Sequence, residues 1–157
     1  MNDVKGPQGT VGSQGHPALT GTLAFRLGTV GTLATARFAA AVEDLGVKPK
    51  HVGLLTVLSG GAPASQQDVA RTMGVVPSLV VTLADQLEGM GAIERVRDPD
   101  DRRRHRLGLT GAGRTLLAEC TARARAVDEE LTAGLSEPER AALAHAMGVL
   151  AREAGLP

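Results

Sequence analysis

A cluster of arginines and carboxylates occupies residues 94–106, ERVRDPDDRRRHR, with six arginines and four acidic side chains. Clustered arginines suit a DNA duplex, which carries about one negative charge per 1.7 Å of axis and releases condensed counterions on contact. A narrow minor groove also attracts inserted guanidinium groups. The interleaved Asp98, Asp100 and Asp101 can shape tight turns and orient neighbouring guanidinium groups. The alternative is a solvated charge run that neutralises itself, which is the common case.

The segments that flank this cluster predict a hairpin. IERVR and HRLGLT are strand-like, and the charged DPDDRRR between them begins with turn residues. Upstream, QQDVART predicts a short helix with Ser65 at its N-cap and Asp68 in its first turn. After Met73-Gly74, Pro77 opens a second helix. Two short helices joined by a glycine-containing turn predict a helix-turn-helix, whose second helix can enter the major groove.

One face of the second helix is predicted to be apolar, formed by Val76, Val80, Leu83 and Leu87. The residues off this face are expected to meet DNA, and they are Ser78, Leu79, Val81, Thr82, Asp85 and Gln86. Gln86 can pair with adenine, Thr82 with several bases, and Val81 or Leu79 can touch a thymine methyl. No Lys or Arg lies between Arg71 and Arg95. We therefore expect the hairpin to supply most of the affinity, with a preference for A·T-rich sites.

Longer helical patterns flank this region on both sides. An apolar period of Leu19, Leu23, Leu27, Val30, Leu33, Phe38, Val42 and Leu45 predicts one helix that Gly46 ends, and Pro49 opens the next. Thr110 caps a long helix striped by Leu117, Cys120, Ala124, Val127 and Leu131. Ser136 and Glu139 form a capping box before a last helix striped by Leu143, Met147, Leu150 and Ala154. Such terminal stripes need covering, and a second copy of the chain is the economical way to do it.

The composition indicates a small intracellular protein. The 157 residues include 17 basic and 17 acidic side chains, two aromatic residues and one cysteine, so no internal disulfide can form. The N-terminus lacks the order of a signal peptide, and no apolar run approaches the ~20 residues that cross a bilayer. We expect a cytoplasmic protein without membrane contact. Residues 1–18 are predicted to be disordered, residues 19–46 and 110–157 to form a helical dimerisation region, and residues 47–109 to bind DNA.

The chain resembles the MarR family of transcriptional regulators, which are winged helix-turn-helix dimers. The resemblance rests on GVKPKHVGLLTVLS, on the run from SQQDVART to GAGRTLL, and on LTAGLSEPERAAL. Its most specific element is the DPDDRR…LT..G wing signature. It implies a mainly α fold with a small β-hairpin wing and long terminal dimerisation helices. It also implies a homodimeric repressor of a pseudo-palindromic operator, which a small phenolic or lipophilic ligand releases.

The resemblance also assigns candidate site residues. Asp101 and Arg103 match the family's wing motif, in which the arginine reaches the minor groove and the aspartate shapes the wing. The predicted DNA-binding residues are Ser65, Gln66, Ser78, Leu79, Val81, Thr82, Gln86, Arg97, Asp101, Arg102, Arg103 and Arg104. The nominated effector-binding residues are Phe25, Arg26, Thr29, Phe38, His51 and Leu55. Each of these six has a structural alternative, as core, surface or interface.

Other functions have weaker support in the sequence. A winged helix without specific DNA binding, used for protein contacts, is consistent with the cation-poor second helix. Cys120 can be a redox sensor only if it is accessible, whereas its apolar stripe favours an inert thiol. The four histidines are scattered without the short spacing of zinc ligands, so no cofactor or metal is expected. No catalytic triad or phosphate-binding loop is suggested, and we reject an enzyme.

Overall fold

A computed structural model describes residues 17–62, 64–98 and 105–155. The wing-tip residues Asp101, Arg102, Arg103 and Arg104 lie outside the described residues. So does the predicted disordered segment, except Pro17 and Ala18, which begin helix α1 (Pro17–Thr20). The chain divides into two compact units, with the boundary between Leu33 and Ala34. Helix α2 (Leu23–Ala41) crosses this boundary.

The N-terminal helical period is interrupted, contrary to the single helix expected. Thr22 separates α1 from α2, because its hydroxyl donates to the Leu19 carbonyl at 2.8 Å and accepts from the Phe25 amide at 3.3 Å. A side chain that caps backbone groups in this way favours a new helix start over continuation. The leucines of this unit are exposed, with Leu19 at 64% and Leu23 at 70% of their surface in solvent.

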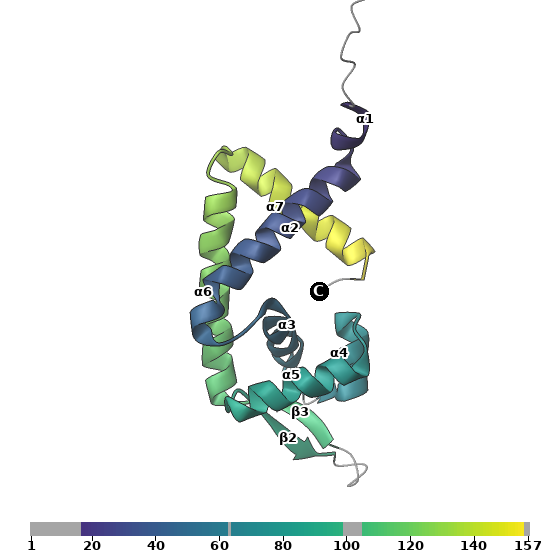
Figure 1. Cartoon of the computed structure of the whole chain (residues 1–157), viewed down its shortest axis with the longest axis vertical. Coiled ribbons are helices and arrows are strands. Elements are labelled where there is room, and N and C mark those ends of the chain that lie inside the picture. The colour runs from purple at the N-terminus through teal and green to yellow at the C-terminus, as the bar shows by residue number, and fades with distance from the viewer. Residues whose placement is uncertain (1–16, 63, 99–104, 156–157) are drawn as a thin grey trace, which may run out of the picture. The chain divides into compact units, whose positions relative to one another are not determined.

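The second unit contains the remaining described elements, among them the predicted helices and hairpin, and Figure 1 shows their course along the chain. In chain order they are η1 (Glu43–Leu45), α3 (Pro49–Leu58), β1 (Ala64–Ser65), α4 (Gln66–Met73), α5 (Pro77–Gly89), β2 (Ile93–Arg97), β3 (His105–Leu109), α6 (Gly111–Leu131) and α7 (Glu137–Glu153). Gly46 was predicted to end the long N-terminal helix, but α2 ends at Ala41, and Gly46, in a left-handed conformation (φ 72°), instead ends the separate 3-10 turn η1. The mainly α class with a hairpin wing is confirmed.

The small sheet has the order β1-β3-β2, and both pairings are antiparallel. Strands β2 and β3 form the predicted hairpin, with Ile93 opposite Leu109 and Arg97 opposite His105. Strand β1 was not predicted from the sequence, and its two residues pair with Leu107 and Arg106. This short strand ties the start of α4 to the wing, so the helix-turn-helix and the hairpin share one sheet.

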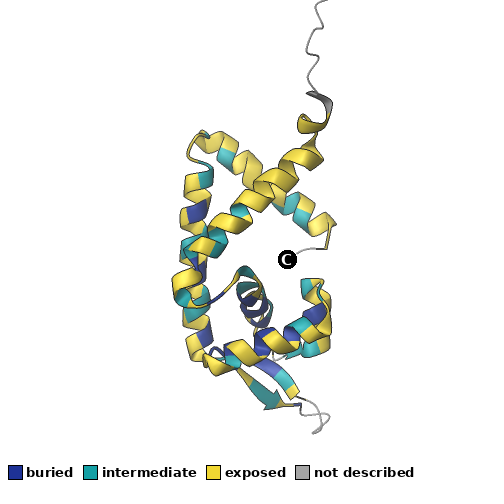
Figure 2. Cartoon of the chain, in the orientation of Figure 1, coloured by how far each residue is buried: buried dark blue, intermediate teal, exposed yellow. Residues whose placement is uncertain are grey.

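The core lies where α3, α4, α5 and the hairpin meet, as the dark-blue segments of Figure 2 indicate. Its largest fully buried side chains are Leu54, Leu55, Leu87, Leu107, Val42, Val69, Val80 and Cys120. Helix α3 contacts α4, α5, α6 and β3, which makes it the central element. Val76 is a correction to the predicted apolar face of α5: it is the N-cap residue and 64% exposed, and Ala84 takes a place on the buried stripe instead.

The predicted caps of the last two helices are confirmed. The Thr110 hydroxyl accepts from the Gly113 amide at 3.0 Å and also contacts the carbonyl of Gly91 at 2.7 Å. Thr110 therefore starts α6 and fastens it to the beginning of β2. At α7, both the amide and the hydroxyl of Ser136 donate to the Glu139 carboxylate. These hydrogen bonds hold the pKa of Glu139 below its usual value.

Candidate nucleic-acid interface

The helix-turn-helix begins with a cap on α4. The Ser65 hydroxyl accepts from the Asp68 amide at 3.2 Å and donates to the Asp68 carboxylate at 2.6 Å. Arg71 also donates to this carboxylate, at 3.1 Å. The Ser65 hydrogen bond, followed by the charge of Arg71, lowers the pKa of Asp68. Gly74 then adopts a left-handed φ of 63° and turns the chain toward α5. Ser65 and Gln66, both predicted to contact DNA, are half-buried at the start of α4.

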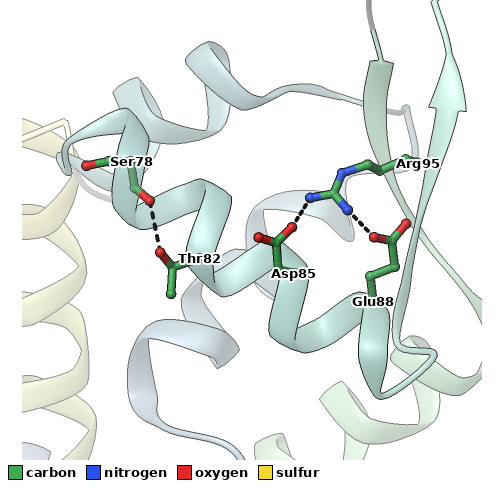
Figure 3. Close-up of polar contacts among 5 residues, drawn as sticks. All are labelled: Ser78, Thr82, Asp85, Glu88 and Arg95. Carbon is green, nitrogen blue, oxygen red and sulfur yellow. Dashed lines mark hydrogen bonds and ion pairs between the residues drawn. The ribbon is translucent and has the colours of Figure 1, made fainter.

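Helix α5 presents a distinct outer face. Val80, Leu83, Ala84 and Leu87 are buried. The predicted DNA-facing residues Ser78, Val81, Thr82 and Gln86 are exposed, and Leu79 is half-buried against the core. Thr82 uses its hydroxyl proton within the helix, since it donates to the Ser78 carbonyl at 3.2 Å (Figure 3). Its oxygen therefore remains as an acceptor for a partner outside the helix.

Arg95 of β2 pairs with two acids of α5, an arrangement that the sequence did not indicate. One guanidinium nitrogen contacts Asp85 and another contacts Glu88, as Figure 3 shows. The arginine side chain is 25% exposed, and the two acids are 60% and 40% exposed. The pairs fix β2 relative to α5 and neutralise two carboxylates beside the predicted DNA face. This matters because unpaired carboxylates there would repel phosphates.

A second ion pair joins Asp98, which follows β2, to Arg106 of β3. Asp98 is 8% exposed and accepts from Nε of Arg106 at 2.7 Å. This buried carboxylate orients the guanidinium group across the hairpin, as a charge-assisted hydrogen bond does. Arg97, predicted to bind DNA, is exposed at the end of β2. The other predicted wing contacts, Asp101, Arg102, Arg103 and Arg104, fall outside the described residues.

The nominated effector residues differ in accessibility. Phe25, Arg26 and Thr29 are exposed on the first half of α2, with Phe25 at 41%. Nε of Arg26 donates to the Thr20 carbonyl at 3.2 Å. Phe38 is half-buried against the core. His51 is 5% and Leu55 0% exposed, so both side chains are buried on α3.

A half-open cavity of about 530 Å³ lies elsewhere in the second unit, between the end of α3, the hairpin and the start of α6. None of the six nominated residues lines it. Its apolar wall includes Leu58, Val96 and Leu117, and Glu94 and Arg114 supply opposite charges. Arg114 already donates to the Leu109 carbonyl at 3.0 Å.

Cys120 is fully buried on α6. Burial raises the pKa of its thiol, and the nearby Glu119 carboxylate adds to this effect. A neutral, enclosed thiol reacts slowly with oxidants, since the thiolate is the reactive form. Within residues 17–62, 64–98 and 105–155, no three His, Cys, Asp or Glu side chains gather as a metal ion would require. Among the helices of these residues, none is both long and apolar enough to cross a bilayer.

A helix-turn-helix joined through a shared sheet to a two-stranded wing defines the winged-helix class. The sequence profile of the MarR family matches residues 45–104. A putative transcriptional regulatory protein for the hcr operon of Thauera aromatica is 34% identical over 138 residues, which are 87% of this chain and 81% of that protein. The chain therefore belongs to the MarR family of transcriptional regulators, as its sequence predicted.

Two solved structures extend the comparison. CouR from Rhodococcus jostii RHA1, bound to p-coumaroyl-CoA, has a TM-score of 0.75 and 28% identity, covering 90% of this chain and 97% of CouR. The Mycobacterium tuberculosis protein Rv2887, in complex with DNA, has a TM-score of 0.72 and 27% identity, covering 82% of this chain and 97% of Rv2887. The family and the relatives found are transcriptional regulators, which are not enzymes.

Proposed function

We propose that this protein is a homodimeric repressor that binds a pseudo-palindromic DNA operator and is released by a small phenolic or lipophilic ligand. The observation that carries the proposal is the outer face of α5, exposed beside a hairpin that leads into the arginine-rich segment 102–104. Helix α5 would enter the major groove, and the wing would reach the adjacent minor groove. Arg97 would contact the phosphate backbone.

Dimerisation is supported by apolar surface that each chain leaves open. Leu143, Met147 and Leu150 lie on one stripe of α7 and are 44–46% exposed, and no residue of α7 is buried. The N-terminal helices expose their own leucines in the same way. A second copy would cover such stripes. Two copies of α5 would then lie about 34 Å apart, one helical turn of DNA, which requires a palindromic site.

Release by a ligand is supported by analogy with CouR, which has been solved with p-coumaroyl-CoA. Among the nominated residues, Phe25, Arg26 and Thr29 have side chains that a ligand can reach. The exposed Arg26 suits a phenolic acid, because its guanidinium group can pair with a carboxylate.

Selection from a random pool of DNA duplexes tests the proposal. Enrichment of a palindrome with half-sites about 10 base pairs apart is expected. Phenolic acids added to the resulting complex should then release the DNA. If no sequence is enriched, specific recognition is refuted. The cation-poor outer face of α5 then favours the alternative of a winged-helix protein-interaction module.

A further inference from the structure

His51 connects the start of α3 to the recognition helix α5. The residue is 5% exposed, and both nitrogens of its ring are used. Nδ1 lies 2.9 Å from the backbone nitrogen of Lys48, and Nε2 lies 2.6 Å from Oε1 of Gln86. His51 thus caps α3 with one nitrogen and holds a side chain of α5 with the other.

The backbone contact determines which ring nitrogen carries the proton. The Lys48 amide can only donate, so Nδ1 must accept through its lone pair. A neutral imidazole with an unprotonated Nδ1 carries its hydrogen on Nε2. Nε2 therefore donates, and its partner on Gln86 must be the amide oxygen. The amide orientation of Gln86 follows from this chain of hydrogen bonds rather than from an arbitrary choice between O and N.

The orientation changes what Gln86 can offer to DNA. With its oxygen against His51, the amide presents its NH₂ group, with two donors, to the exterior. Pairing with adenine requires an outward acceptor for N6 as well as a donor for N7. The adenine contact expected from the sequence is therefore disfavoured. Outward donors match bases that carry a carbonyl oxygen in the major groove, which are guanine through O6 and thymine through O4.

We propose that His51 is a specificity-determining positioning residue, which makes Gln86 a donor and directs it to a guanine or thymine of the operator. The proposal rests on the proposed function, because it requires that α5 lies in the major groove. It adds a preference at one base position, and it places the origin of that preference in a buried residue of α3.

Two substitutions of His51 keep the cap of α3 but present opposite hydrogen-bonding groups to Gln86, a donor in one case and an acceptor in the other. In His51→Gln the side-chain oxygen can accept from the Lys48 amide while its NH₂ donates to Gln86, as the imidazole does. In His51→Glu the carboxylate accepts from Lys48 at a favourable helix N-terminus, but it has no donor. Gln86 must then turn its NH₂ inward and its oxygen outward. An outward acceptor matches adenine N6 or cytosine N4.

The experiment is operator selection with the full chain, carried out for wild type, both His51 variants and Gln86→Ala. We expect wild type and His51→Gln to prefer guanine or thymine at one position by about fivefold or more, at the lower end of specific base contacts. His51→Glu should shift that position to adenine or cytosine, and Gln86→Ala should lose the preference. Thermal melting of each variant shows that the fold is retained.

A second measurement is independent of DNA. Nitrogen-15 NMR of the wild-type imidazole should show a protonated Nε2 and an unprotonated Nδ1, and the opposite tautomer would overturn the proposal. An unchanged base preference in His51→Glu, or in Gln86→Ala, would also overturn it while leaving the regulator function intact. If wild type selects no sequence at all, the proposed function fails and the specificity proposal fails with it.

Discussion

The winged-helix core and helix α7 place their leucines in opposite environments. Leu54, Leu87 and Leu107 are fully buried between α3, α5 and β3, whereas Leu143 and Leu150 of α7 are each 44% exposed. Burial of a leucine stabilises a fold by about 1.5–3 kcal/mol, so the core gains its stability within one chain. The stripe of α7 gains little until something covers it. We therefore expect that folding of the DNA-binding region and assembly of the dimer can each be altered without the other.

The largest effect is expected from Gly113→Ala, which disturbs the packing of α6 against the winged-helix core. A Cβ atom at Gly113 would lie 1.9 Å from the Ala92 carbonyl oxygen and 2.8 Å from Cδ1 of Leu109. Helix α6 can approach β2 only without a side chain there. We expect a loss of about 4 kcal/mol in the free energy of unfolding, measured by urea denaturation.

Gly134→Ala is the matched control, because a Cβ atom there meets nothing within 4 Å. It should change the free energy of unfolding by less than about 0.5 kcal/mol. A Gly113→Ala variant as stable as this control would show that α6 has room to move away from β2.

The role of the exposed stripe of α7 in dimerisation is tested by the double variant Leu143→Glu and Leu150→Glu. Two charges on the apolar stripe of α7 should convert the dimer to monomer, because an uncompensated buried charge costs several kcal/mol at an interface. Light scattering coupled to gel filtration measures the mass, and the helical signal of the monomer should persist.

His145→Glu places a charge on α7 by a helical rotation of about 160° from Leu143, away from the stripe. This control should remain dimeric. A dimer that survives the double substitution would refute the assignment of this stripe to the interface.

A smaller effect, on DNA affinity, is expected from breaking the ion pairs between β2 and α5. Arg95→Met removes the partner of Asp85 and Glu88 and leaves two carboxylates near the DNA. Because these groups are partly exposed, we expect an affinity loss of about fivefold, corresponding to about 1 kcal/mol. Adding Asp85→Asn to Arg95→Met should recover part of that loss in a fluorescence-anisotropy titration. No recovery would mean that Arg95 acts by some means other than neutralising Asp85.

The smallest effect is expected in the chemical modification of the Cys120 thiol. Because burial raises the pKa of its thiol, little thiolate forms near neutral pH. Modification by a disulfide reagent should be negligible in the native protein over minutes and complete in denaturant. Rapid native modification, with release of DNA that Cys120→Ser abolishes, would instead support the redox-responsive alternative.

Most helix caps and buried helix faces were predictable from the sequence, whereas the side-chain contacts between different elements were not. Ser65, Thr110 and Ser136 cap helices as predicted, because a cap depends on residues three positions away. The period of Leu117, Cys120 and Val127 likewise identified the inner face of α6, on which Cys120 and Val127 are buried.

The unpredicted features join residues that lie on different elements of the fold. Arg95 with its two acids, Asp98 with Arg106, and β1 with β3 all depend on how the elements pack. His51 and Gln86 are separated by 35 positions, and the sequence nominated them for two unrelated roles, effector binding and adenine recognition. Side-chain partners at such separations follow from tertiary packing, which periodicity does not encode.

The most direct test of DNA binding through the wing is the salt dependence of binding to a selected operator. It should be measured for wild type and for a variant with Arg102, Arg103 and Arg104 changed to Ala. We predict that the affinity of wild type falls steeply as salt is raised. The slope of log K against log salt should be shallower in the variant, by about 0.9 for each arginine that neutralises a phosphate. An identical slope in both proteins would contradict a DNA-contacting wing.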